Sequence, residues 1–186
     1  MIRILIADDH AIVRAGLRQF IADQADMQVA GEASTGSETI ALVRASEFDV
    51  VLLDISMPDK NGIDTLKTLK QVRPELPVLM LSGYAEDQYA VNLLRAGAAG
   101  YLSKEAASTQ LVGAIRTVVL GRKFVSPTLA QILADGVTGD ADRPLHGELS
   151  QREFQIFCKI AAGAAVSKIA DERSTGRQVI SPFLIA

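Results

Sequence analysis

The chain has 186 residues, a hydrophobic fraction of 48% and a formal net charge of −3, so it can build a packed core and is not a largely disordered protein. Its single cysteine, Cys158, excludes an internal disulfide framework and a cysteine-based zinc site. No apolar run reaches the roughly 18 residues of a membrane span, and no basic-then-apolar leader precedes the first strand pattern, so we expect a cytoplasmic protein without a membrane partner.

Strand and helix patterns alternate through the first 120 residues. The predicted strands are Ile2–Ala7, Met27–Ala30, Val50–Asp54, Val78–Ser82 and Gly100–Ser103. The predicted helices cover about Ala11–Ala22, Gly36–Ala45, Gly62–Val72, Glu86–Arg95 and Ala107–Leu120. This strict alternation predicts an α/β fold: a flavodoxin-like, doubly wound, five-stranded parallel sheet in the order 2-1-3-4-5, covered by helices on both faces.

The strand Val50–Asp54 ends in a carboxylate that follows four apolar residues. This is the pattern of a buried parallel strand, and a buried carboxylate is costly unless it is paired, hydrogen-bonded or metal-bound. Other predicted strands end in groups that can serve as its partners: Asp8, Asp9, Ser82 and Lys104. Taken singly, each aspartate is explained as a helix cap or a turn residue. Their convergence with a hydroxyl and an ammonium at one sheet edge indicates a functional site instead.

The chemistry of this edge favours phosphoryl transfer. Three neighbouring carboxylates repel one another, so one is protonated or a cation lies among them, and oxygen ligands at an aqueous edge favour Mg²⁺. Lys104 and Ser82 supply the positive charge and the donor that a phosphoryl group needs. Asp54 is then the best nucleophile, which predicts an aspartyl phosphate. His10 is either a ligand or a local structural residue at a helix start, and we favour the second reading.

Beyond residue 120 the composition changes. Residues 121–148 are richer in glycine, proline and polar residues, which is typical of a linker. Within them, Thr128–Ala134 is a candidate short helix.

Residues 149–186 have the pattern of a small all-α segment. Ser150 and Glu153 form a capping box at the start of one helix, and a second short helix covers Val166–Glu172. Two short helices with a glycine-containing joint are consistent with a helix-turn-helix.

Several motifs resemble those of a known family. The motifs are Asp8–His10, Asp54–Pro58, Ser82 and Gly100–Lys104. In this order and spacing they are similar to the receiver domain of bacterial two-component response regulators, over about residues 1–120. Val13–Leu17 and Leu149–Glu153 are similar to the NarL/FixJ subfamily, whose output is a LuxR-type helix-turn-helix that binds DNA.

The resemblance implies a role for each residue of the acidic edge. Asp54 corresponds to the phosphoacceptor. Mg²⁺ is expected to be held by Asp9, Asp54 and the backbone carbonyl of Ser56, with Asp8 helping through water. Lys104 is expected to contact the phosphoryl group.

The resemblance also implies partners and a conformational switch. Ser82, which also contacts the phosphoryl group, and Tyr101 correspond to the pair that moves on phosphorylation. The phosphodonor is expected to be a sensor histidine kinase or a phosphotransfer protein, and homodimers through the receiver helices occur in the family. The chain is expected to be a phosphoacceptor with Mg²⁺-dependent self-phosphorylation and dephosphorylation chemistry, not a turnover enzyme.

The similarity to the LuxR-type output ends after about residue 172. The family has a large apolar residue where this chain has Arg173, and the matching recognition helix holds Gly176 and Pro182. A proline in a helix interior costs about 3 kcal/mol. We therefore expect the helix-turn-helix of residues 149–186 to be truncated or divergent.

This divergence bears on DNA binding. The matching segment offers no residues other than Arg177 and Gln178 that could contact DNA bases. No closing helix follows before Ala186. Promoter DNA is the partner of full-length members, but we expect no specific DNA binding by the chain as given.

Three functional hypotheses remain. The leading one is a phosphorylation-switched transcription regulator, and the alternative is a receiver that acts through protein contacts or as a phosphate sink. A haloacid-dehalogenase-type phosphatase also uses an aspartate nucleophile and Mg²⁺. It needs a second acid two residues after the nucleophile, where this chain has Ser56, so the enzyme hypothesis is disfavoured.

Overall fold

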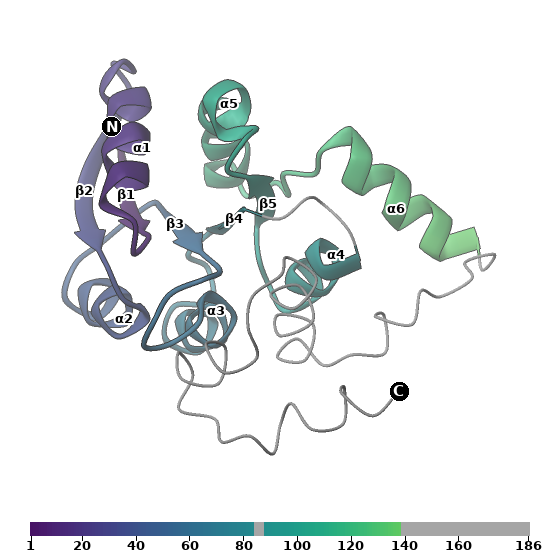
Figure 1. The fold of residues 1–186 in the computed structure, drawn as a ribbon, viewed down its shortest axis with the longest axis horizontal. Coiled ribbons are helices and arrows are strands. Elements are labelled where there is room, and N and C mark those ends of the chain that lie inside the picture. The colour runs from purple at the N-terminus through teal and green to yellow at the C-terminus, as the bar shows by residue number, and fades with distance from the viewer. Residues whose placement is uncertain (84–87, 139–186) are drawn as a thin grey trace, which may run out of the picture. The chain divides into compact units, whose positions relative to one another are not determined.

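The computed structural model describes residues 1–83 and 88–138. They form a five-stranded sheet of β1 (Ile2–Ala7), β2 (Met27–Ala33), β3 (Val50–Asp54), β4 (Val78–Ser82) and β5 (Gly100–Ser103) (Figure 1). The strand order is β2-β1-β3-β4-β5, and every neighbouring pair is parallel. The predicted flavodoxin-like, doubly wound fold is therefore confirmed.

The helices cover the sheet on both faces. They are α1 (Ala11–Ala22), α2 (Gly36–Ala45), α3 (Gly62–Val72), α4 (Gln88–Arg95), α5 (Ala107–Val119) and α6 (Pro127–Thr138). Figure 1 shows α1 and α5 on one face and α2, α3 and α4 on the other. Because both faces are covered, β3 and β4 are buried along their whole length, which explains their continuous apolar sequence.

Side chains of the central strands alternate between the two faces. One face packs against α1 and α5 through Ile4, Ile6, Leu52, Leu79, Leu81 and Leu102, together with Leu17, Ile21, Leu111 and Ile115 of the helices. Side chains of a strand alternate, so Ser82 and Tyr101 point to the opposite face. Met80 pairs with Tyr101 and Ser82 with Ser103, so Ser82 and Tyr101 are diagonal neighbours.

The strand β2 is longer than predicted. It was expected to end at Ala30 but runs to Ala33, because its pairing with β1 continues past a register shift between Ile4 and Leu5. At the shift, Gly31 pairs with Leu5, and a Cβ added at Gly31 would lie 3.1 Å from the Phe48 ring. The glycine therefore admits the ring beside this edge strand.

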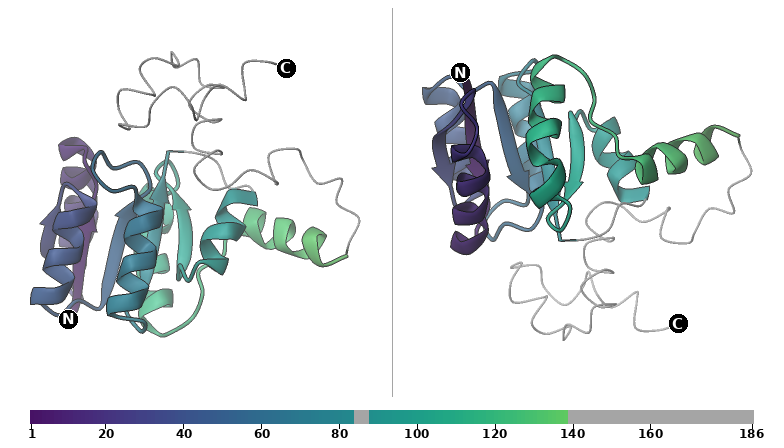
Figure 2. Two further views of the ribbon diagram at one scale, coloured as in Figure 1. Left: turned by 90° about the horizontal axis from the view of Figure 1, so that it is seen from below. Right: turned by 90° about the horizontal axis from the view of Figure 1, so that it is seen from above.

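The region predicted as mostly linker contains the helix α6, which extends beyond the expected Thr128–Ala134. It starts at Pro127 because Ser126 caps it, accepting a hydrogen bond from the Leu129 N–H at 3.1 Å, and because proline suits the first helical position. Leu129 is fully buried, and α6 packs on α4 (Figure 2).

The segment before α6 closes one edge of the sheet. Phe124 N–H donates to the carbonyl of Ala99 at 2.9 Å, and Phe124 forms an isolated parallel bridge with Gly100. The approach is close, because a Cβ added at Gly100 would lie 2.8 Å from Phe124 Cβ. The outer edge of β5 is therefore partly paired rather than open.

The described residues belong to the first of the two units into which the chain divides, Met1–Ala141. The helix-turn-helix expected in residues 149–186, with Arg177 and Gln178, lies outside the described residues. The start of the helix predicted from Glu86 also lies outside them. The division into residues 1–120, 121–148 and 149–186 stays a prediction. Within 1–83 and 88–138, no helix has the length and apolar character needed to cross a bilayer.

Candidate functional site

The carboxyl ends of β1 and β3 bring two aspartates to one place. Ala7 pairs with Leu53, so Asp8 and Asp54 follow at the ends of neighbouring strands. Asp8 is 0% exposed and Asp54 is 1% exposed. Asp9, one residue beyond Asp8, is partly exposed. The sheet order thus produces the predicted acidic edge, with two of its three carboxylates buried.

Lys104 lies between the two buried carboxylates. Its Nζ is 2.7 Å from Asp8 Oδ2 and 3.1 Å from Asp54 Oδ2. The residue follows β5, and its backbone N–H donates to the carbonyl of Ser82 at 2.7 Å, so the lysine extends the pairing of β4 and β5. The sequence placed Asp8, Asp54 and Lys104 at three different strand ends. In the structure, Lys104 contacts both aspartates.

Burial and charge shift two pKa values in this cluster. Burial raises the pKa of Asp54, and the negative charge of Asp8 raises it further, while Lys104 opposes both. Burial by itself would lower the pKa of Lys104, but its hydrogen bond with Asp8 and the charge of Asp54 outweigh burial and raise it. The protonated form of Lys104 is therefore favoured, and the charged form of Asp54 is disfavoured.

The acidic cluster also fits a metal ion. The buried atoms Asp8 Oδ2, Asp9 Oδ1 and Asp54 Oδ2 have, among the described residues, only ion pairs with Lys104 or His10. Potential ligand atoms of Asp8, Asp9, His10 and Asp54 all lie within 4.8 Å of one another. Carboxylate oxygens at this density are the ligands of a hard divalent cation, so the cluster is compatible with Mg²⁺.

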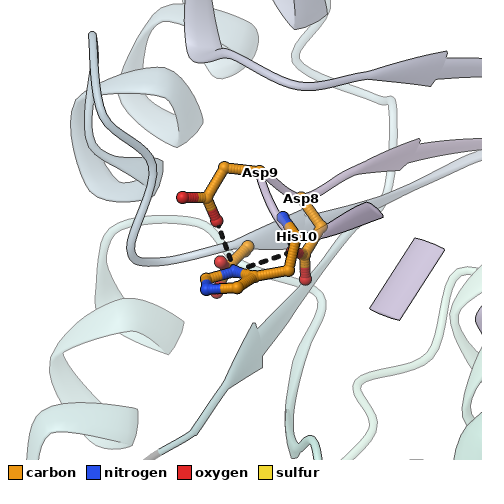
Figure 3. Close-up of side chains that lie close together, drawn as sticks. Asp8, Asp9 and His10 are labelled. Atoms are coloured by element: carbon orange, nitrogen blue, oxygen red, sulfur yellow. Dashed lines mark hydrogen bonds and ion pairs between the residues drawn. The ribbon is translucent and has the colours of Figure 1, made fainter. Parts of the chain in front are cut away.

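The His10 side chain lies against Asp8 and Asp9 (Figure 3). Its backbone N–H donates to Asp8 Oδ1 at 2.8 Å, and its imidazole Nδ1 lies 2.6 Å from Asp9 Oδ1 and 3.4 Å from Asp8 Oδ1. The side chain is 60% exposed and occupies the N-cap position of α1. These contacts within the acidic turn are in keeping with the local structural role that we favour.

The loop between β3 and α3 lies against Asp54. The pairing of β3 with β4 continues into this loop, because Ile55 N–H donates to Leu81 O at 3.1 Å. The loop closes where Gly62 N–H donates to Ile55 O at 2.9 Å. A Cβ added at Gly62 would lie only 2.1 Å from the Asp54 carbonyl oxygen, so α3 begins in backbone contact with the end of β3.

The two residues expected to form the switch are both inside the protein. Ser82 is 1% exposed and Tyr101 is 0% exposed, and they project from neighbouring strands toward the same face. The Tyr101 ring thus already lies in the interior, where we expect it after phosphorylation.

Two residues near the site, Arg14 and Asp59, were not identified from the sequence. Arg14 of α1 donates through Nη1 to the backbone carbonyl of Asp8 at 2.7 Å, and its Nε lies 3.4 Å from Glu32 Oε2. Asp59, in the loop after β3, accepts hydrogen bonds from the first N–H groups of α2. No local pattern reveals either contact, because each joins separate elements of the sheet domain.

A family model described as the response regulator receiver domain matches residues 4–116, which include Asp8, Asp9, Asp54, Ser82, Tyr101 and Lys104. The chain belongs to the response regulator family. This response regulator is 34% identical over 184 residues to the response regulator UvrY of Escherichia coli O6:H1, covering 98% of this chain and 84% of UvrY. It is thus a two-component response regulator close to UvrY.

Solved structures agree with this assignment. A LuxR-family two-component response regulator from Aurantimonas sp. SI85-9A1 has a TM-score of 0.68 and 32% identity to this response regulator, covering 73% of this chain and 97% of that one. A structure of the RcsB response regulator of Salmonella typhimurium, described as showing conformational dynamism for DNA interaction, has a TM-score of 0.67 and 26% identity. It covers 97% of this chain and 87% of the RcsB chain.

Proposed function

We propose that Asp54 is the phosphoacceptor of this response regulator. The observation that carries the proposal is the contact of one ammonium group with two buried carboxylates at the carboxyl edge of the sheet, 2.7 Å from Asp8 and 3.1 Å from Asp54. Asp54 ends a strand that is buried along its whole length, and its charged form is disfavoured by burial and by Asp8. Attaching a phosphoryl group to Asp54 replaces one carboxylate charge with a group of higher negative charge, and Lys104 is placed to contact the new phosphoryl oxygens.

The transfer step is a displacement at phosphorus. A carboxylate oxygen of Asp54 forms a P–O bond as the bond between phosphorus and the donor's leaving group breaks, and the leaving group takes the electron pair. Lys104 donates to the phosphoryl oxygens, and the Ser82 hydroxyl does so from β4. Hydrolysis of the aspartyl phosphate by water returns the carboxylate and inorganic phosphate. The protein is thus a phosphoacceptor that is phosphorylated and then dephosphorylated on Asp54, rather than a turnover enzyme.

The acidic cluster is the proposed Mg²⁺ site. Asp9, Asp54 and the backbone carbonyl of Ser56 are the proposed ligands, with Asp8 acting through water. When bound, the ion supplies positive charge that offsets the acids and the incoming phosphoryl oxygens. The support is the set of buried carboxylate oxygens that have only ion pairs among the described residues.

The proposed partners follow from the family. A sensor histidine kinase or a phosphotransfer protein supplies the phosphoryl group, in the cytoplasm, and receiver helices pair two copies.

Ser82 and Tyr101 form the proposed switch. Attraction of the Ser82 hydroxyl to the phosphoryl group stabilises the inward Tyr101 ring, so two packings of one core exchange. The diagonal placement of these two residues on β4 and β5 supports the coupling.

The phosphoacceptor proposal predicts metal-dependent phosphate uptake. The full chain, incubated with acetyl phosphate and Mg²⁺, is expected to gain one phosphoryl group in intact-mass analysis, and peptide mapping is expected to place it on Asp54. The same reaction with a chelator should give no uptake, because the acids then repel the donor. Uptake without Mg²⁺, or on another residue, would contradict the proposal.

The output of the switch has two candidate forms. The leading form regulates transcription through DNA, as the similarity to LuxR-family structures supports. The alternative is a receiver that acts through protein contacts or as a phosphate sink, which the divergent sequence after residue 172 favours. We expect no specific DNA binding by this chain. Fluorescence anisotropy on promoter fragments at physiological salt, with and without phosphodonor, is the test, and a sequence-specific nanomolar affinity would support the leading form instead.

A further inference from the structure

The first turn of α2 receives its hydrogen-bond acceptors from two separate places. The first N–H groups of a helix have no partner within the helix. In α2, Thr35 Oγ1 accepts from Glu38 N–H at 3.1 Å, which is an ordinary cap from the preceding residue. The Gly36 and Ser37 N–H groups donate instead to Asp59, at 2.9 Å to Oδ1 and 3.1 Å to Oδ2. Asp59 lies 22 and 23 residues later in the chain.

Asp59 belongs to the loop that carries Ser56. This loop, residues 55–61, leaves β3 directly after Asp54 and is closed by the hydrogen bond from Gly62 N–H to Ile55 O. Among residues 1–83 and 88–138, the other polar contacts of the loop are with the loop itself, β3, β4 and α3. Lys60 Nζ, for example, donates to Thr68 Oγ1 at 2.9 Å. The Asp59 carboxylate therefore provides the hydrogen bonds that fasten the loop to α2.

The contact between the loop and α2 leaves no room for the loop to move closer. A Cβ added at Gly36 would lie 2.6 Å from the Lys60 carbonyl oxygen and 2.3 Å from Thr65 Oγ1. Asp59 therefore pulls the loop against a surface that stops it at a fixed distance. The hydrogen bonds to Asp59 and the close contact at Gly36 together fix the position of the loop backbone. In metal sites, residues that hydrogen-bond to the ligands fix the position of the ligands in the same way.

We propose that Asp59 is a positioning residue for the Mg²⁺ site, holding the loop after β3 against the N-terminus of α2 so that the Ser56 carbonyl faces the acidic cluster. The proposal rests on the metal site proposed above. It assigns Asp59 no contact with the ion. When Asp59 is removed, the acids remain, but the loop that supplies the carbonyl is held by one fewer element.

The charge of Asp59 suits this role. Burial by itself would raise the pKa of Asp59, but hydrogen bonds from the Ser37 side chain and from the N–H groups of Lys60, Gly36 and Ser37 lower it from 3.8 to about 2. The carboxylate is thus ionised at any pH at which the protein works, and it faces the positive end of the helix dipole. Because the folded pKa is depressed, its contribution to stability is present above about pH 4 and is lost as the pH falls through 2.

Three variants of the full chain test the proposal. Asp59→Ala removes both hydrogen bonds from the α2 backbone, and Asp59→Asn keeps one acceptor without the charge. Thr35→Ala is the matched control, because it removes the other cap of the same helix end, whose bond is to Glu38 N–H and not to the loop. Mg²⁺ affinity is measured by NMR titration of backbone amides without phosphodonor. Hydrogen exchange of residues 55–61 is measured without metal.

We expect Asp59→Ala to bind Mg²⁺ about tenfold more weakly and to exchange faster across residues 55–61, with Asp59→Asn in between and Thr35→Ala like the wild type. The difference in urea midpoint between Asp59→Ala and the wild type should shrink as the pH falls from about 4 toward 2.

Two results would overturn the assignment. One is an Asp59→Ala affinity within twofold of the wild type. The other is an equal loss in Thr35→Ala, which would mean that a weaker α2 explains the effect. If the wild type itself binds no Mg²⁺, the proposed metal site fails, and the metal-free exchange still decides whether Asp59 holds the loop: unchanged exchange in Asp59→Ala would show that it does not.

Discussion

Replacing Asp54 by Asn is expected to abolish phosphate uptake and, at the same time, to make the metal-free protein more stable. An amide is not nucleophilic enough to accept a phosphoryl group, so intact-mass analysis with acetyl phosphate and Mg²⁺ should show none. Stability should rise because burial and Asp8 disfavour the Asp54 charge, while Lys104 keeps its 2.7 Å partner Asp8 in the variant. The gain is expected as a higher urea midpoint for the variant than for the wild type, both measured without metal.

Asp26→Asn is the control for this substitution. Asp26 is an exposed acid on the same sheet domain, paired with Arg116 through Oδ1 at 2.9 Å. Its loss should leave phosphate uptake unchanged and should not raise stability, because the Asp26 charge is favoured by that pair. Equal phosphate uptake by Asp54→Asn and the wild type would refute the assignment of Asp54, and a loss of metal-free stability would refute the electrostatic account of the cluster.

Among the substitutions described in this Discussion, Gly62→Ala is expected to lower the free energy of unfolding the most. The added Cβ would lie 2.1 Å from the Asp54 carbonyl oxygen and 2.8 Å from Ile55 Cα, and both contacts are with backbone atoms that cannot rotate away. The helix α3 must then move off the end of β3, which costs about 3 kcal/mol and displaces the strand end that bears Asp54. Phosphate uptake should fall with stability. Urea unfolding followed by circular dichroism measures the first effect.

Gly113→Ala is the matched control. Gly113 lies in α5, and a Cβ there would have no neighbour within 4 Å. The same chemical change should therefore stabilise the protein by about 0.5–1 kcal/mol, because alanine favours a helix interior over glycine. If Gly62→Ala were as stable as Gly113→Ala, the close contact between α3 and β3 would be wrong.

The sheet and the acidic cluster were predictable because both depend on local patterns. Alternating strand and helix periodicity leads to the order 2-1-3-4-5, and in a parallel sheet the residues after each strand meet at one edge. Asp8, Asp54 and Lys104 lie together for that reason. Each was identified by its place at a strand end, without knowledge of any contact.

The features that were not predictable involve contacts between distant residues. Asp59 looks like an ordinary turn residue after Pro58, and only the folded chain brings it to the N-terminus of α2. The strand β2 was expected to end before Gly31, which usually interrupts a strand, but here the glycine admits the Phe48 ring. The inward position of Tyr101 depends on how β4, β5 and the helices pack, which the alternation of side chains leaves open.

The bridge between Phe124 and Gly100 has a consequence for the exchange of modules between regulators. A receiver cut after α5 would lose Phe124 and Leu129 together, leaving a bare edge on β5 and exposing the surface that buries Leu129. Bare strand edges and apolar surfaces are the usual origin of unwanted association. A chimaera that grafts this receiver onto a new output should therefore be joined after residue 138, so that α6 stays with the helix α4 on which it packs.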